Sequence, residues 1–245
     1  TVRSALFINL LTEDNLPYYF RDIERMFGRD GAWGTWVRRW TAEENRHSTV
    51  IRDYLTVTRA IDPAELERAR MAQMSGGKVP EPPSAADGLI YVSLQELATR
   101  ISHRNTGLAL QNHDRVGYDI MRQVAIDANR HHIFYRDMAS AVIEIDPSMG
   151  VLAMERQIIG FTMPGDGIPG FARHAKAIAA AGIYDLAAHY EQILKPVVLK
   201  HWGLETLTGL TPEAEAARER VLAHIEKTGR VAQRLSQRKQ SLVDA

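Results

Sequence analysis

The chain has 245 residues and no cysteine. Disulfides, zinc–thiolate sites and iron–sulfur clusters are therefore excluded, and any metal ion must be held by histidines and carboxylates. A net charge is also lacking, because 30 basic side chains balance 30 acidic ones. Without an overall positive field, nucleic acid is not expected as the main partner.

Long hydrophobic runs are missing as well. No stretch is long enough to span a bilayer, and no signal peptide opens the chain. We therefore expect a cytoplasmic protein that is not integral to a membrane. The first residue is a threonine that leads straight into the apolar run Ala5-Leu6-Phe7-Ile8. This pattern favours a helix already under way, so we expect that residues upstream have been removed.

The hydrophobic periodicity is helical almost throughout, and no stretch shows the sustained alternation of a strand. A first helix is expected at about 2–27, bent or split at Pro17. After a turn at 28–34, a second helix is expected at about 32–61. Asp62-Pro63 restarts a short helix to about Met74, and residues 75–84 form a long Gly/Pro-rich loop.

The second half repeats this pattern of long helix, short turn and long helix. Asp87 is expected to cap a helix over 88–111, and Asp114 a helix that runs to about Ile145. Shorter helices are expected at 148–162, 170–181, 185–201 and 212–238. Two helix pairs joined by one long crossover predict an all-α, ferritin-like four-helix bundle with additional C-terminal helices outside it. We expect a single domain over residues 1–245.

Two pentapeptides in the chain are near copies. They are Glu43-Glu44-Asn45-Arg46-His47 and Asp127-Ala128-Asn129-Arg130-His131. The first contains Glu-x-x-His, whose acid and imidazole share one helix face, and the second has Ala128 where the glutamate would stand. Two Glu-x-x-His motifs, with one Glu from each of two other helices, form the ligand set of a carboxylate-bridged di-iron site. The sequence therefore indicates this chemistry with one ligand missing.

The candidate ligands continue apolar helix faces. Glu44 and His47 extend a stripe that contains three tryptophans, and Glu96 shares its face with Leu89, Val92 and Thr99. Glu13 and His131 also have apolar residues one or two turns away on the same face. A buried carboxylate needs a partner, and a metal ion is one such partner.

Each of these residues also has an ordinary structural interpretation. Glu13 and Glu44, taken singly, fit solvated helix carboxylates, and Glu96 fits an ion pair with the arginine four residues later. His131 fits a hydrogen-bonded core histidine, and the hydroxyl of Thr99 fits a bond back to a helix carbonyl. The repeated Asn-Arg-His is what favours the metal site for His131.

Taken together, these residues resemble the soluble acyl-acyl-carrier-protein desaturases in their plastid and actinobacterial forms. The matching stretches are Thr12 to Pro17, Trp36 to His47, Gln95 to His103 with Asn105-Thr106, Asp127 to His131, and residues 182–185 and 206–210. The resemblance implies a centre of two iron ions. It implies that O₂ and two electrons from ferredoxin remove two hydrogens from a saturated acyl chain carried as a thioester on acyl carrier protein. It also implies a homodimer.

The resemblance implies roles for single residues. The residues at ligand positions are Glu13, Glu44, His47, Glu96 and His131. Asp127 matches an acid that orients a ligand histidine, and Thr99 matches a threonine beside the metals. The chain departs from the family at Ala128, where members carry Glu. It also has only twelve residues before Glu13, where the family has an N-terminal extension.

Ala128 leads to a specific expectation about the metal site. Glu44 and the missing glutamate would be the bridges, with Glu13 and Glu96 as terminal ligands. Loss of one bridge predicts a gap for water or a small anion, incomplete metal occupancy and at most low activity. Asp127 is not expected to compensate, because the neighbouring position turns it about 100° around the helix. The alternative is that the chain uses the gap as an open coordination position.

A cavity wall for the acyl chain is expected at Gly88, Leu89 and Val92, which have core packing as their alternative. An acidic carrier protein would need a locally basic docking surface. The helix-borne pairs Arg21/Arg25 and Arg38/Arg39 are the candidates.

The sequence is also compatible with two other functions. One is another di-iron oxidase, such as a hydroxylase or N-oxygenase, acting on a carrier-bound substrate. The other is a metal-poor homologue that binds acyl carrier protein without turnover.

Overall fold

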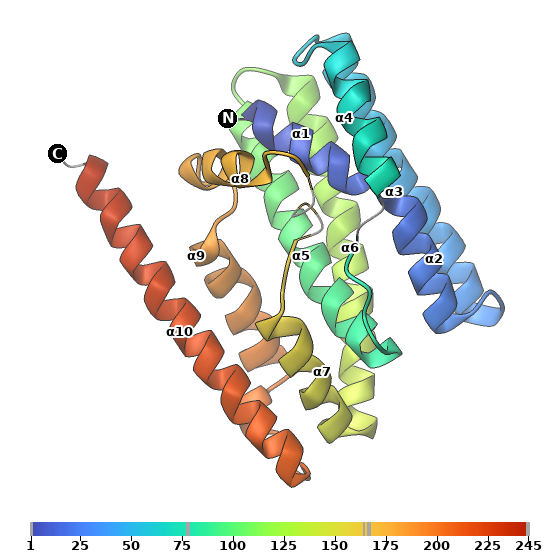
Figure 1. Cartoon of the computed structure of the whole chain (residues 1–245), viewed down its shortest axis with the longest axis vertical. Coiled ribbons are helices and arrows are strands. Elements are labelled where there is room, and N and C mark those ends of the chain that lie inside the picture. The colour runs from blue at the N-terminus through green and yellow to red at the C-terminus, as the bar shows by residue number, and fades with distance from the viewer. Residues whose placement is uncertain (1, 77–78, 164, 166–167, 244–245) are drawn as a thin grey trace.

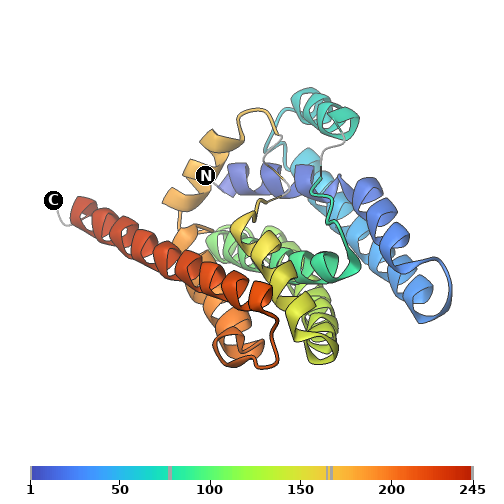
Figure 2. The same ribbon diagram turned by 60° about the horizontal axis from the view of Figure 1, so that its bottom comes forward.

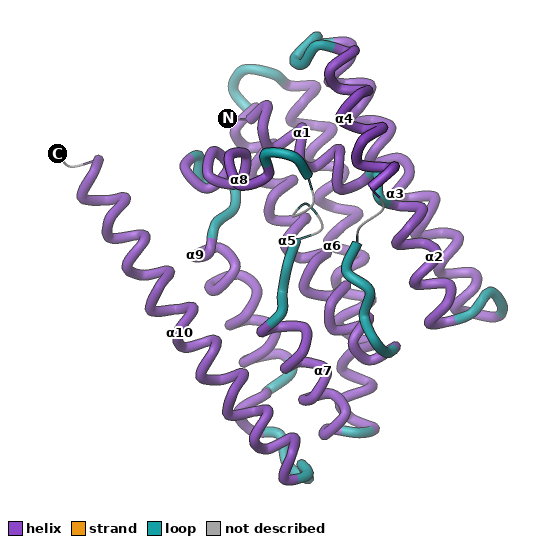
Figure 3. Tube along the Cα trace, viewed as in Figure 1, coloured by secondary structure: helices purple, strands orange, loops and turns teal. Residues whose placement is uncertain are grey.

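The structure is a computed structural model that describes residues 2–76, 79–163, 165 and 168–243. Within these ranges it consists of helices and loops, without a strand (Figure 3). The elements in chain order are α1 (Val2–Glu13), α2 (Leu16–Phe27), α3 (Gly31–Val57), α4 (Pro63–Gly76), α5 (Ala85–Leu110), α6 (Arg115–Ile145), α7 (Pro147–Ile159), α8 (Phe171–Ala180), α9 (Leu186–His189), the π-helix η1 (Tyr190–His201), the 3₁₀-helix η2 (Leu204–Thr206) and α10 (Pro212–Val243). The predicted all-α class is confirmed.

Four rods form the central bundle: α1 continued by α2, then α3, α5 and α6. Figure 1 shows α2, α3, α5 and α6 running along the long axis of the molecule, with α1 slanted across it. Both α1 and α2 pack on α3 and α5, and α5 packs along much of α6. The crossover that carries α4 joins α3 to α5, as the sequence predicts for a ferritin-like bundle.

The first rod is split rather than bent. α1 ends at Glu13 and α2 begins at Leu16, which places Pro17 in the first turn of α2. Proline is tolerated there because the first turn has no carbonyl partner for its missing N–H. Beside the break, the buried carboxylate of Asp14 accepts hydrogen bonds from Arg70 of α4 at 2.6 and 3.1 Å. The crossover is thereby tied to the point where Glu13 enters the bundle.

Asp87 does not cap its helix, and that prediction was wrong. α5 begins at Ala85, and the N-cap Ser84 accepts the backbone N–H of Asp87 at 3.2 Å. Serine is as good an N-cap as aspartate, and Ser84 lies three residues before Asp87. Asp87 is instead fully buried and binds Arg156 at 2.8 and 2.9 Å and Gln157 at 2.8 Å, which ties α5 to α7.

The remaining helix boundaries follow the predicted order with small shifts. Asp114 caps α6 as predicted and accepts the N–H of Gly117 at 2.9 Å. α3 ends at Val57, a few residues short of the predicted 61. The helix expected at 185–201 is α9 followed by a π-helix that contains Pro196, whose missing N–H interrupts the regular ladder.

The C-terminal elements form an outer layer on one side of the bundle. α7 packs on α5 and α6, and α10 packs on α7, α9 and η1. Figure 2 shows α10 on the side of the molecule opposite α2 and α3. No helix in the described ranges is long and apolar enough to cross a membrane.

A polar layer lies between two apolar clusters inside the bundle. On α3, Trp40 belongs to one cluster and Ile51 to the other; on α6, Tyr135 and Met121 do the same. Between these positions both helices turn buried polar side chains inward. The predicted ligands occupy this layer.

Candidate metal centre

The structure brings the five predicted ligands together from four rods. They form two groups, Glu13 with Glu44 and His47, and Glu44 with Glu96 and His131. Within each group, one candidate ligand atom per residue lies within 4.8 Å of the others. All five side chains are buried. We call these groups the Glu13 triad and the Glu96 triad. Glu44 belongs to both, which is the position of a bridging carboxylate.

Each histidine faces its triad with one nitrogen and an acid of the opposite helix with the other. His47 Nδ1 lies 3.4 Å from Glu44 Oε2 and 3.8 Å from Glu13 Oε2, whereas its Nε2 lies 3.6 Å from Asp127 Oδ2. Asp127 also accepts from Arg130 at 3.0 Å. This arrangement leaves Nδ1 as the candidate metal-binding atom.

His131 repeats the arrangement from α6. Its Nδ1 lies 2.7 Å from Glu44 Oε1 and 3.6 Å from Glu96 Oε1, and its Nε2 lies 2.9 Å from Glu43 Oε2. Glu43, which precedes Glu44 on α3, therefore faces His131 of α6. In the same way Asp127, which precedes Ala128 on α6, faces His47 of α3. The two helices thus contribute equivalent residues to the site, and we call this relation the approximate twofold exchange between α3 and α6.

Three residues around the ligands were not assigned from the sequence. Glu43 faces His131, and the signal for it was present, because Glu43 occupies the same place in its pentapeptide as Asp127 does. His103 Nε2 lies 3.1 Å from Glu13 Oε1, and Trp40 Nε1 donates to Glu96 Oε1 at 3.2 Å. Neither contact had a local signal, because the partners lie on different helices.

The donor atoms fit metal ions. Glu44 Oε1 and His131 Nδ1 are buried 2.7 Å apart, and neither has a hydrogen-bond partner among the described residues. Leaving such atoms unsatisfied is costly, and either a proton or a metal cation between them would satisfy both. Imidazole and carboxylate together suit iron and the other divalent metals that favour nitrogen and oxygen ligands. The residues present thus fit one metal ion at each triad.

Without metal, the side chains neutralise one another. Burial opposes charge on His47, but Glu44 and Asp127 outweigh it and hold the pKa of His47 well above its usual value. Burial likewise opposes charge on His131, yet Glu96 and Glu44 raise the pKa of His131 to about 11. Burial and the Glu44 carboxylate raise the pKa of Glu96 to about 7. Metal ions must therefore displace ring protons, and metal affinity should increase with pH.

A narrow cavity of about 40 Å³ reaches the two triads. Its lining includes side chains of α2 and α5 and two of the prolines of the crossover loop, among them Ile23, Met26, Pro80, Pro82 and Val92. Thr99 also lines the cavity, while its hydroxyl donates back to the carbonyl of Glu96 at 3.0 Å. Ala128 lines it beside Glu44.

Of the three predicted wall residues, Val92 lines the cavity, and Gly88 and Leu89 do not. Leu89 is in the apolar core. Gly88 faces Met26, and a Cβ there would lie 2.8 Å from the sulfur of Met26. The cavity follows the face of α5 that carries Val92, Glu96 and Thr99, and it ends before Leu89, which lies one turn earlier on that face.

The predicted basic pairs are largely engaged with acids. Arg21 lies 3.0 Å from Asp22, and Arg39 lies 3.1 Å from Glu43. A different basic surface lies between α5 and α6, where Arg100, Arg104 and Arg122 have no ion pair among the residues that the structure describes.

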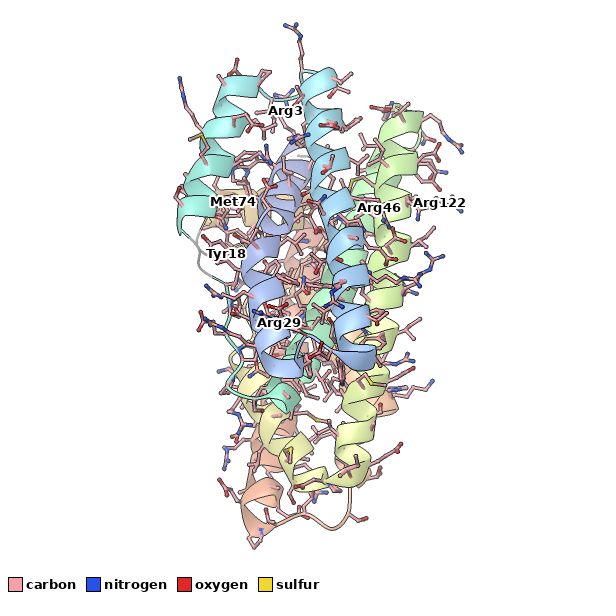
Figure 4. All side chains as sticks on the ribbon, turned by 90° about the vertical axis from the view of Figure 1, so that its right-hand side faces the viewer. Arg3, Tyr18, Arg29, Arg46, Met74 and Arg122 are labelled. Carbon is pink, nitrogen blue, oxygen red and sulfur yellow. The ribbon has the colours of Figure 1, made fainter. Side chains whose placement is uncertain are left out.

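This surface, which we call the basic groove, has a volume of about 420 Å³ and also includes Arg130. Figure 4 shows α3 and α6 side by side, with Arg122 on α6 pointing outward. A solvent-facing cluster of arginines of this kind suits an acidic partner.

Comparison with known proteins supports the resemblance read from the motifs. The sequence profile of the family described as "Fatty acid desaturase" matches residues 1–244. DesA1 of Mycobacterium tuberculosis, named as an acyl-acyl-carrier-protein desaturase, is 44% identical over 223 residues, which cover 88% of this chain and 65% of DesA1. A chloroplastic stearoyl-acyl-carrier-protein 9-desaturase of Arabidopsis thaliana is 35% identical over 251 residues, covering 96% of this chain and 63% of that protein.

The chain therefore spans slightly less than two thirds of the length of these relatives, at 65% and 63%. The X-ray structure of DesA2 from Mycobacterium tuberculosis, named as an acyl-ACP desaturase, superposes with a TM-score of 0.61 at 22% identity. That match covers 85% of this chain and 76% of DesA2, and it shows a shared, ferritin-like helical fold. The profile match over nearly the whole chain, together with these relatives, establishes that the chain belongs to the fatty acid desaturase family.

Proposed function

We propose that this chain is an acyl-acyl-carrier-protein desaturase, an oxidoreductase that introduces a double bond into a saturated acyl chain at a centre of two iron ions. The observation that carries the proposal is the placement of the two triads, which share Glu44 at the inner end of a largely apolar cavity. Its relatives carry the names of acyl-acyl-carrier-protein desaturases. The homodimer, O₂ and ferredoxin implied by the resemblance belong to the same proposal.

The protein's part in the reaction is to hold ligands and exclude water. Glu13 and His47 would hold one ion and Glu96 and His131 the other, with Glu44 facing both. When bound, iron with O₂ supplies the oxidising power that an unactivated C–H bond requires, since no side chain is basic enough to deprotonate it. Glu43 accepts the Nε2 proton of His131, and the nearby charge of Asp127 favours a proton on Nε2 of His47, so each Nδ1 is left to face its triad.

The acyl chain would enter between α2 and α5. The cavity is bounded there by Ile23, Met26 and Val92, and by Pro80 and Pro82 of the crossover loop. At about 40 Å³ it is too small for a long acyl chain, so these walls must move apart on binding. Met26 is suited to this because its unbranched side chain repacks readily. Apolar walls that close around the chain keep water from the metals.

The basic groove is the proposed docking surface for an acidic electron donor of the ferredoxin class. Its positive charge comes from Arg100, Arg104 and Arg122, none of which has an ion-pair partner in the described part of the chain. A short route leads inward from this surface, because Arg130 binds Asp127 at 3.0 Å and Asp127 lies 3.6 Å from His47. The groove lies on the α5–α6 face, whereas the cavity is bounded by α2, α5 and the crossover loop. The carrier protein would thus use a different surface.

A second function is favoured by one observation, the alanine at position 128. With one carboxylate missing, the chain would serve as a metal-poor homologue that binds acyl carrier protein without turnover. Replacement of Ala128 by Glu distinguishes the two functions, with Ala128→Gln as a control that fills the space without adding charge. Iron content and product mass are measured for all three proteins.

For a desaturase impaired by the gap, Ala128→Glu raises the iron content toward two ions per chain and increases a product that is two hydrogens lighter. Ala128→Gln does neither. A product that gains oxygen instead identifies a hydroxylase. Carrier binding with no iron and no product in any variant identifies the non-catalytic homologue and refutes the proposal.

A further inference from the structure

We infer that the space beside Ala128 is a binding site for a small carboxylate, formate or acetate, which replaces the missing glutamate side chain when two metal ions are bound. The inference rests on the proposed function, since it concerns the same metal centre. It adds a ligand that no residue of this chain supplies.

The approximate twofold exchange between α3 and α6 locates the site. Glu43 faces His131 at 2.9 Å and Asp127 faces His47 at 3.6 Å. Position 128 on α6 is therefore placed relative to α3 in the same way as position 44 on α3 is placed relative to α6. The carboxylate of Glu44 faces both histidines, at 3.4 Å from His47 and 2.7 Å from His131. A carboxylate beside Ala128 would face the same two triads from the other side.

The size of the gap matches the ligand. Glu differs from Ala by four heavy atoms, a methylene carbon and a carboxylate group, and acetate has the same four. Ala128 is 2% exposed and lines the cavity together with Glu13, Glu44 and Glu96. The cavity volume of about 40 Å³ corresponds to roughly three water molecules. The cavity that Ala128 shares with the triads is thus of the size of one acetate or formate ion.

Charge makes an anion the better occupant than water. Two divalent ions bring four positive charges, whereas the two triads contain three glutamates, Glu13, Glu44 and Glu96. The further acids Glu43 and Asp127 are balanced by their ion pairs with Arg39 and Arg130. One positive charge is therefore left over in a buried site, which is unfavourable. A monocarboxylate would cancel it and would offer the same two oxygen donors as the missing glutamate side chain, whereas water brings no charge and chloride offers a single, softer donor atom.

The same three carboxylates make the site dependent on metal. Without metal these carboxylates and the two histidines neutralise one another, so no positive charge is left over to hold an anion, and acetate and the second metal ion should bind together. Such coupling is reciprocal: acetate raises the affinity for the second ion by the factor by which that ion raises the affinity for acetate. The reciprocity gives a readout that does not require turnover.

The test is an anaerobic titration with Mn²⁺ followed by calorimetry and electron paramagnetic resonance. Wild-type protein is titrated in acetate and in chloride at equal ionic strength, so that screening is the same in both. We expect acetate to lower the apparent Kd of the second Mn²⁺ by about tenfold or more, or about 1.4 kcal/mol. The resonance spectrum should change from that of an isolated ion to that of a coupled pair.

Two variants supply the controls. Ala128→Glu carries its own carboxylate, so it should bind two ions in either salt without responding to acetate. Ala128→Gln fills the space without charge, so it should bind the second ion weakly in both salts.

The inference is overturned if wild-type protein binds two ions equally well in chloride, if acetate has no effect on it, or if Ala128→Gln responds to acetate as wild type does. The metal centre itself survives these outcomes as long as Ala128→Glu binds two ions. If no variant binds metal, the proposed function fails as well.

Discussion

Replacing Glu43 by glutamine should weaken metal binding at the Glu96 triad, although Glu43 is not a candidate ligand. Its carboxylate lies 2.9 Å from His131 Nε2 and fixes the proton on that nitrogen. Acids in this position usually contribute about 10- to 100-fold to metal affinity or activity, or about 1.4–2.8 kcal/mol. We expect Glu43→Gln to fall in this range.

The distances predict a smaller effect for the equivalent substitution Asp127→Asn. Asp127 lies 3.6 Å from His47 Nε2, beyond hydrogen-bond range. With an effective dielectric constant of about 20, the attraction of a full charge pair is about 5.7 kcal/mol at 2.9 Å and about 4.6 kcal/mol at 3.6 Å. Only part of this reaches the metal, because a metal-bound imidazole carries little net charge. Asp127→Asn should therefore lie near the tenfold end.

The assay is the same anaerobic Mn²⁺ titration, in which the two ions bind in separable steps. Arg39→Gln is the matched control, because Arg39 pairs with Glu43 at 3.1 Å on the exposed side. It removes that surface ion pair but leaves Glu43 against His131, so metal affinity should stay close to the wild-type value. Equal losses for Arg39→Gln and Glu43→Gln, or no loss for Glu43→Gln, would refute this account of the site.

Three further predictions concern the cavity, acid stability and the basic groove. Val92→Phe should narrow the cavity, so that shorter acyl chains are preferred while the metal content is unchanged; an unchanged chain-length profile by product analysis contradicts this. Burial lowers the pKa of His189 to about 4, below its unfolded value of about 6.5. Its contribution to stability is therefore complete above the unfolded pKa and lost as pH falls toward 4. Between pH 7 and pH 5 wild type should lose about 2 kcal/mol more than His189→Gln in urea unfolding, and equal losses would show that His189 is not responsible. Arg104→Glu should slow reduction by an acidic iron–sulfur protein and flatten its salt dependence, whereas Arg38→Glu, on α3, should do neither; an equal effect of both charges would exclude the groove as the docking surface.

The sequence by itself determined the features that depend on neighbours within one or two helical turns. Helical periodicity predicted the long helices, Asp114 predicted the start of α6, and the spacing of Glu44 and His47 placed them on one face. The same local signals marked the difference at Ala128, because the two pentapeptides can be compared residue by residue. These features hold in any packing of the helices, since they follow from 3.6 residues per turn.

Only the tertiary structure decided which side chains meet across the bundle. Glu43 faces His131 from 88 residues away, and His103 faces Glu13 from 90 residues away. Ser84 rather than Asp87 caps α5, because Asp87 is bound by two side chains of α7. Val92 lines the cavity and Leu89 does not. Arg21 and Arg39 are paired, whereas Arg104 has no ion pair within the described residues. Each outcome depends on the rotation and crossing angle of packed helices. These are set by how side chains of all four rods interdigitate, which the local sequence of any one helix does not contain.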